Sequence, residues 1–277
     1  MAQLQGWAVH ISWCADHTYV ECPDLGKYFQ CWGLQQVPGQ VLVTTGDGNY
    51  PVANCYRCPV DLFGTIYPDT ACIGAYGVNG VCHQSANCFL ITAGTTLNFQ
   101  VRGYWFSLLM YGTYGNFWLF WAVLGGCLLS AGVEVPTAEE LAMASNPSLP
   151  DQIRDLYEKS KNEKPAPSHN EMLMREAALV TKFYAPDVDP AHFRDLHATL
   201  LAHKDEAIRS GATGAELAAK LNAVAAEHQG HLAARLGAEA YQKLMGAAPG
   251  ETLNIIEPDA EPATGVAPPK TTPEGDA

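Results

Sequence analysis

Residues 7–22, WAVHISWCADHTYVEC, decide the fold expected for the N-terminal part of this chain. In the first half of the stretch, large apolar residues alternate with small or polar ones, which is the period of two of a β-strand. A two-residue turn at 15–16 then predicts a second, antiparallel strand over 17–22. In this register His10 and Glu21 lie directly opposite each other on one face of the hairpin.

Outward from the hairpin, the sequence predicts a small antiparallel sheet and one helix. Further strands are expected over 28–32 and 41–45, and residues 46–80, rich in Gly, Pro, Asn and Asp, are expected to form a long connection. A helix over 81–93 and a strand over 95–102 follow. The fold class expected for this half is therefore α+β, with the sheet packed on the helix.

Charge and cysteine content change abruptly near Pro136. Residues 1–135 contain all nine cysteines, three basic and seven acidic residues, whereas residues 136–277 contain 13 basic and 22 acidic residues. This contrast predicts an α+β domain over 1–135, an all-helical domain over 136–247 and a disordered acidic, Pro-rich tail over 248–277. The net charge of −13 argues against nucleic acid as a partner.

The second half carries several signals of helix termini. Three Ser or Thr residues are followed three positions later by glutamate, the pattern of a capping box: Thr137 with Glu140, Ser168 with Glu171, and Thr213 with Glu216. Asp189 before Pro190 indicates a further helix start. Apolar residues at helical spacing over 217–236 predict a core-facing helix. We expect this half to be an interaction or regulatory module for a protein partner.

Residues 103–133 carry no charge and are rich in aromatic side chains. Two interpretations stand: buried strands of the N-terminal domain, or membrane contact through residues 114–133, a stretch long enough to span a bilayer. No signal peptide opens the chain, so we expect a cytoplasmic protein, membrane-associated under the second interpretation. Its thiols are then reduced, and serve as packing residues, metal ligands or a nucleophile.

Cys82 is the candidate nucleophile. It lies in Gly-Val-Cys-His-Gln at the start of the expected helix, where unpaired N–H groups and the helix dipole stabilise a thiolate. The Cys82 N–H can also serve in an oxyanion hole. The alternative is a small buried cysteine in a core helix, as expected for Cys88.

A cysteine nucleophile needs a base, and His10 is the first choice because the expected hairpin places it beside Glu21. A carboxylate next to an imidazole fixes its tautomer and supports its protonated form. His17 is the alternative base. His83 adjoins Cys82 in sequence, and neighbours on a helix point in different directions.

A histidine on an early strand, a polar residue on the next strand and a cysteine opening a later helix resemble the circularly permuted papain-like superfamily. This group includes relatives of lecithin retinol acyltransferase and the NlpC-like cell-wall peptidases. The resemblance covers residues 5–100 and rests on His10 in Ala-Val-His-Ile-Ser, Glu21 in Thr-Tyr-Val-Glu-Cys, and Cys82. It implies a permuted papain-like fold and thiol-based acyl chemistry on a peptide, amide or acyl substrate, as hydrolase, deamidase or acyltransferase. The family's Asn-Cys-Glu-His-Phe motif is absent around Cys82.

A zinc site is the competing interpretation, and it would make the chain a non-enzymatic zinc-binding or membrane-associated interaction protein. Cys55 and Cys58 form a Cys-x-x-Cys pair, and Cys14 and His17 have the same spacing, so that together they give a Cys₃His set. In the helical half, residues 227–231 read EHQGH, with two histidines three apart on one helix face. His228 also falls on the apolar stripe, so packing is the favoured interpretation of that pattern.

Overall fold

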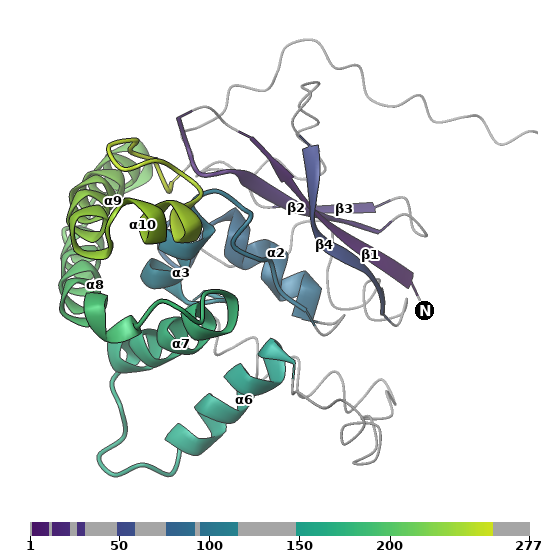
Figure 1. The fold of residues 1–277 in the computed structure, drawn as a ribbon, viewed down its shortest axis with the longest axis horizontal. Helices are drawn as coiled ribbons and strands as arrows, with labels where there is room; N and C mark the ends of the chain where they lie inside the picture. The colour runs from purple at the N-terminus through teal and green to yellow at the C-terminus, as the bar shows by residue number, and fades with distance from the viewer. Residues whose placement is uncertain are drawn as a thin grey trace, which may run out of the picture.

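The computed structural model describes residues 2–10, 13–22, 27–30, 49–58, 76–91, 95–115 and 148–256 (Figure 1). An antiparallel sheet lies on one side of the molecule and most helices on the other, which confirms the predicted α+β class. The strands are β1 (Ala2–Val9), β2 (His17–Cys22), β3 (Lys27–Gln30) and β4 (Asn49–Cys58). The helices are α2 (Cys82–Leu90), α3 (Tyr104–Tyr111), α6 (Leu149–Ser160), α7 (His169–Tyr184), the 3₁₀ helix η3 (Pro190–Phe193), α8 (Arg194–Arg209), α9 (Gly214–Leu236) and α10 (Ala238–Met245).

The four strands follow the order β3-β2-β1-β4, and each neighbouring pair is antiparallel. Strands β2 and β3 confirm two of the expected strands. Strand β4 lies inside residues 46–80, where a connection was expected, so that expectation is wrong. Pro51 in its sequence argues against a central strand, but β4 is an edge strand, where proline is tolerated. The strand expected over 41–45 lies outside the described residues.

The register of the first hairpin also differs from the prediction. Val9 pairs with His17 and Gln5 pairs with Glu21, so the chain reverses over residues 10–16 instead of in a two-residue turn. The expected pairing of His10 with Glu21 is therefore wrong. Ala and Asp are a weak hairpin signal compared with Asn-Gly or Asp-Gly, and contacts from distant segments hold the longer loop instead.

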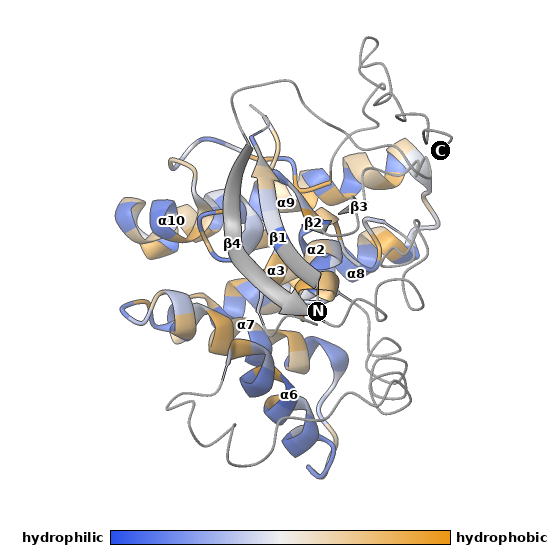
Figure 2. Cartoon of the chain, turned by 90° about the vertical axis from the view of Figure 1, so that its right-hand side faces the viewer, coloured by the Kyte–Doolittle hydropathy of each residue, from blue (hydrophilic) through white to orange (hydrophobic). Residues whose placement is uncertain are grey.

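Helix α2 packs mainly on β2, and it lies between the sheet and the helical part (Figure 1). Residues Ala8, Thr18 and Val20 are completely buried on one face of the β1–β2 pair, whereas Trp7 and Tyr19 on the other face are partly exposed. Side chains alternate between the two faces of a strand, so the buried face is the one against α2. Figure 2 shows the strands in front of α2 and α3.

Helix α3 occupies the centre of the molecule, in the part of residues 103–133 where buried strands were one expectation, whereas the possible membrane contact over 114–133 lies outside the described residues from position 116 onward. It contacts α7, α8 and α10, and every residue from Tyr104 to Tyr111 is buried. A helix that is apolar all round is a buried helix, which explains the uncharged sequence. Residues 95–102, the other expected strand, form turns and irregular chain, so both strand predictions are wrong here. Among the described residues, no helix has the length and apolar character needed to cross a bilayer.

The second half is helical, as predicted. Ser168 and Glu171 form the expected capping box at the start of α7, and Asp189 caps η3 with Pro190 in its first turn. Thr213 precedes α9 without a side-chain cap, so the predicted capping box of Thr213 with Glu216 is wrong, and Thr137 and Glu140 lie outside the described residues. Helices α6 and α7 show mixed hydrophilic and hydrophobic colouring, as expected of helices with one exposed face (Figure 2).

The chain after α10 returns to the N-terminal half. Residues 248–256, expected to begin the disordered tail, contain the buried side chains of Leu253, Ile255 and Ile256. Asn254 forms an isolated bridge with Cys14. The folded core therefore extends to residue 256, while residues 257–277 and the expected boundary at Pro136 lie outside the described residues.

Candidate functional site

A tight turn aims the first residue of α2 at the sheet. The N–H of Gly77 donates to the carbonyl of Gly80 at 2.8 Å, and the hydroxyl of Tyr111 donates to the carbonyl of Gly77 at 2.8 Å. Gly115 lies under this turn, where an added Cβ would be 2.3 Å from the carbonyl oxygen of Asn79. The turn is therefore held by the Tyr111 hydroxyl of α3 and by close packing against Gly115, in the chain that follows α3.

Helix α2 begins at Cys82, as predicted. Gln84 accepts a hydrogen bond from the N–H of Val81, the N-cap, at 3.0 Å. Cys82 is 2% exposed, and its Sγ donates to the carbonyl of Asp16 at 3.9 Å. N–H groups in a first helical turn lack intrahelical acceptors, and their partial positive charge favours a thiolate at this position.

His10 pairs with Asp16 in the loop between β1 and β2. Val9 and His17 are the last pair of the β1–β2 ladder; His10 directly follows Val9, and Asp16 directly precedes His17. His10 Nδ1 lies 3.1 Å from Asp16 Oδ1. His10 is the first residue after the end of β1. Asp16 is 1% exposed, whereas the His10 side chain is 52% exposed. A carboxylate on Nδ1 leaves Nε2 of the ring directed away from the acid.

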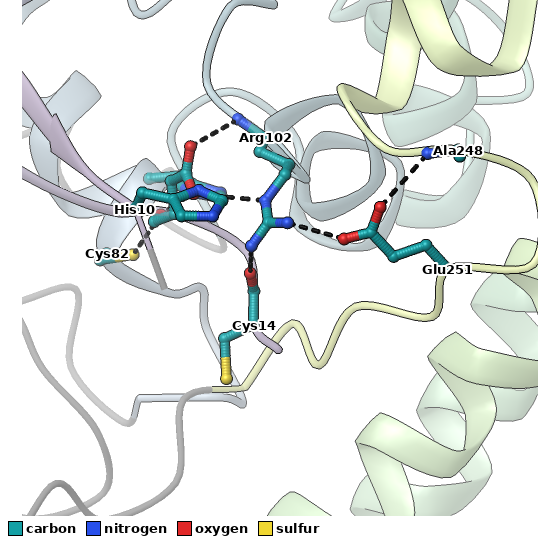
Figure 3. A network of polar contacts seen from close by, with 8 residues as sticks. His10, Cys14, Cys82, Arg102, Ala248 and Glu251 are labelled. Atoms are coloured by element: carbon teal, nitrogen blue, oxygen red, sulfur yellow. Dashed lines mark hydrogen bonds and ion pairs between the residues drawn. The ribbon is translucent and has the colours of Figure 1, made fainter. Parts of the chain in front are cut away.

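Arg102 holds the Asp16 carboxylate from the other side. Its backbone N–H donates to Asp16 Oδ2 at 3.2 Å, and its Nε lies 3.4 Å from Asp16 Oδ1. The guanidinium also donates to the carbonyl of Cys14 at 2.9 Å and to Glu251 at 2.7 Å. Figure 3 shows Arg102 at the centre of this network, which links the hairpin loop to the chain after α10.

His83, next to Cys82, is a positioning residue. Its Nε2 lies 2.8 Å from the carbonyl of Asp16, and its Nδ1 lies 2.7 Å from the hydroxyl of Ser107. A carbonyl oxygen only accepts, so Nε2 carries the proton. Both ring nitrogens are thus engaged, and the ring ties the first turn of α2 to the loop that carries Asp16.

The other predicted site residues lie elsewhere. Glu21 accepts a hydrogen bond from Trp7 Nε1 at 2.9 Å, and the alternation of β2 places it on the face away from α2. His17, the alternative base, opens β2 on the same face as Glu21 and is buried. Cys88 is buried in the middle of α2, and burial raises the pKa of its thiol well above the ordinary range. Both cysteines are buried, but Cys82 opens α2, where N–H groups are free, whereas Cys88 lies inside the helix, and this difference in position favours Cys82 as the nucleophile.

The predicted Cys₃His zinc set is not formed. Cys58 pairs with Ala2 at one end of β1, whereas His17 pairs with Val9 at the other end. These two positions are separated by the length of the strand, roughly 20 Å at ~3.3 Å per residue. One ion cannot bind ligands this far apart. Within the described part of the chain, the side chains that could hold a metal ion are instead His203, Glu227 and His228.

Sequence reasoning missed Asp16 and Arg102. The sequence pattern places Asp16 in a turn, and Arg102 directly precedes the uncharged segment over 103–133 without a motif of its own. A signal was present, because Arg102 is one of only three basic residues in the first 135. A rare charge in an apolar half is rarely buried without a partner. The partner itself depends on a loop that only the fold defines.

Comparison with known proteins gives no relative for this chain: no family model, no curated protein and no solved structure matches it.

Proposed function

We propose that this protein is a thiol-dependent hydrolase or acyltransferase that acts on an amide or ester bond. Cys82 is the nucleophile, His10 the base and Asp16 the acid that orients His10. The observation that carries this proposal is the convergence of the three residues: Asp16 binds His10 through its carboxylate and contacts the Cys82 thiol through its carbonyl. Asp16 takes the role that the sequence suggested for Glu21.

The chemistry follows from the positions of these groups. The Asp16 carboxylate fixes the proton of His10 on Nδ1, so that Nε2 accepts the thiol proton. The Cys82 sulfur then forms a bond to the substrate carbonyl carbon, and the oxyanion receives hydrogen bonds from the first turn of α2. His10 returns the proton to the leaving amine or alcohol as its bond breaks. Water or an amine then attacks the acyl-enzyme, and the cysteine is released.

The layout also supports a permuted papain-like arrangement within the α+β fold. The histidine lies at the end of the first strand, and the cysteine opens a later helix that packs on the sheet. A peptide, amide or acyl group is the substrate class that this chemistry requires. Asp16 contacts both His10 and Cys82, and this shared partner supports the proposal that the two residues belong to one site.

Thiol labelling against pH tests the proposal. Native protein is treated with iodoacetamide between pH 5 and 9, and the modified cysteines are assigned by mass spectrometry. We expect Cys82 to react near neutral pH and Cys88 to react only after unfolding, because burial raises the Cys88 pKa. Circular dichroism of each variant confirms that the folded state is being labelled.

Two variants and one control separate the roles. His10→Ala and Asp16→Asn should shift the labelling of Cys82 to higher pH, because each removes support for the thiolate–imidazolium pair. Glu21→Gln is the matched control, since Glu21 contacts Trp7 on the other face of the sheet, and should leave the profile unchanged. Equal Cys82 profiles in wild type and His10→Ala would refute the proposal, as would a Cys82 that labels only after unfolding.

A further inference from the structure

We infer that the helical half binds one transition-metal ion between α8 and α9, through His203, Glu227 and His228. This site shares no residue with the Cys82 site and does not depend on it. His203 lies on α8, and Glu227 and His228 are neighbours on α9. The two helices pack on each other, which brings one potential ligand atom from each side chain to within 4.8 Å of the others.

The two imidazole rings have the spacing of metal ligands. His228 Nε2 lies 3.1 Å from His203 Nδ1, and the ring centroids are 5.1 Å apart with planes inclined by 61°. In a tetrahedral zinc site with bonds of about 2.0–2.1 Å, two nitrogen ligands lie about 3.3 Å apart. An adjustment of a few tenths of an ångström therefore opens the pair to an ion. The exposed Glu227 side chain is able to rotate its carboxylate toward the same point.

The burial of His228 is the second observation that points to a ligand. His228 is 1% exposed and occupies a position of the apolar stripe between Ala225 and Leu232, both buried. Its Nδ1 is buried without a hydrogen-bond partner among the described residues, and its Nε2 reaches only another imidazole. A leucine would fill this position without an unsatisfied polar atom, which costs about 1–3 kcal/mol. Nε2 is the ring atom that faces His203, so an ion bound to Nε2 would replace this contact between two imidazoles with a bond to each of them.

The ligand types identify the class of ion. Two neutral imidazoles with one carboxylate suit Zn²⁺, Co²⁺, Ni²⁺ or Cu²⁺, whereas Mg²⁺ and Ca²⁺ prefer oxygen ligands alone. His231 lies one turn further along α9, with its ring centroid 6.0 Å from that of His228, and is not one of the three clustered side chains. An ion here links α8 to α9 and stabilises the folded helical half.

Cobalt binding to the full chain tests the inference. Metal-free protein is titrated with Co²⁺, and the visible absorption of the bound ion gives its number per chain and its affinity; thermal unfolding is recorded with and without Zn²⁺. We expect wild type to bind one ion, and His203→Ala to bind it at least ~100-fold more weakly. The loss should be this large because removing even an outer-shell partner of a metal costs about 10–100-fold in affinity. His228→Leu should lose the same ion while keeping the apolar packing of α9.

His192→Ala is the matched control, because His192 is exposed on η3 outside the cluster. It should bind cobalt as wild type does and show the same zinc-dependent rise in melting temperature. Two results would overturn the inference: no ion bound at micromolar Co²⁺ or Zn²⁺, or the same number of ions and the same melting shift in wild type and His203→Ala. The second result would place any bound metal outside the cluster of His203, Glu227 and His228.

Discussion

His197 should make the folded state lose stability as the pH falls through the ordinary pKa of histidine. Its side chain is buried, and its Nε2 lies 2.7 Å from the carbonyl of Leu109, so the ring joins α8 to α3. Burial lowers the pKa of His197 from 6.5 to about 4, with a smaller lowering from Lys204 and an opposing effect of the Leu109 carbonyl. The unfolded chain therefore binds a proton between these two values that the folded chain does not.

The size of the effect follows from this difference. Each pKa unit corresponds to about 1.4 kcal/mol, so lowering the pH from 8 to 5 costs about 2 kcal/mol, and the loss approaches about 3 kcal/mol below pH 4. Glu176 acts in the opposite direction, because burial raises the pKa of its carboxyl. The total pH dependence therefore mixes several groups, and only a comparison of variants isolates His197.

Urea unfolding of wild type and His197→Gln at several pH values makes that comparison. The amide of glutamine is able to donate to Leu109, and it does not titrate. The stability advantage of wild type over His197→Gln should shrink by about 2 kcal/mol between pH 8 and pH 5. Parallel stability curves for the two proteins would show that His197 titrates alike in both states, and the reasoning from burial would be wrong.

Two further variants test the supports of the Cys82 site. Gly115→Ala should lower the free energy of unfolding by clearly more than Gly211→Ala. Both glycines have φ near +76°, but only at Gly115 would an added Cβ lie against Asn79. Comparing the thermal unfolding of the two variants isolates the effect of that contact. Glu251→Gln should cost less than about 1 kcal/mol in urea unfolding, because its ion pair with Arg102 is partly exposed; a larger loss would show that the pair is effectively desolvated.

The periodicity of apolar residues predicted those helices and strands whose two faces differ in burial. Strand β2 has one fully buried face and one that is partly exposed at Tyr19 and Glu21, helix α9 has a buried and an exposed face, and the sequence placed both correctly. Helix α3 is buried on all sides, so its apolar residues carry no period, and strands were expected in its place. Strand β4 was missed because its proline and asparagines are typical of a connection, and only its edge position permits them.

The residues of the candidate site also differ in whether a local sequence pattern could predict them. Cys82 was predictable because a glycine before a helix start is a local signal, and α2 begins there as expected. Asp16 was not predictable, because segments far away in the chain hold its loop: the N–H of Asp16 donates to the carbonyl of Arg102, and the N–H of Ala15 donates to that of Asn254. No local pattern in residues 10–16 contains these partners.

The error in the hairpin register explains why His10 contacts Asp16 and not Glu21. The position of His10 next to β1 follows from the strand pattern of residues 7–9, which the sequence shows directly. The residue opposite His10 depends on the length of the loop, and a loop of seven residues in place of two changes Glu21 to Asp16. If Asp16 orients His10, then the segment after α10 matters to the chemistry, because it holds the loop through Arg102 and Asn254. The helical half would then act on the reactive cysteine through the position of one carboxylate.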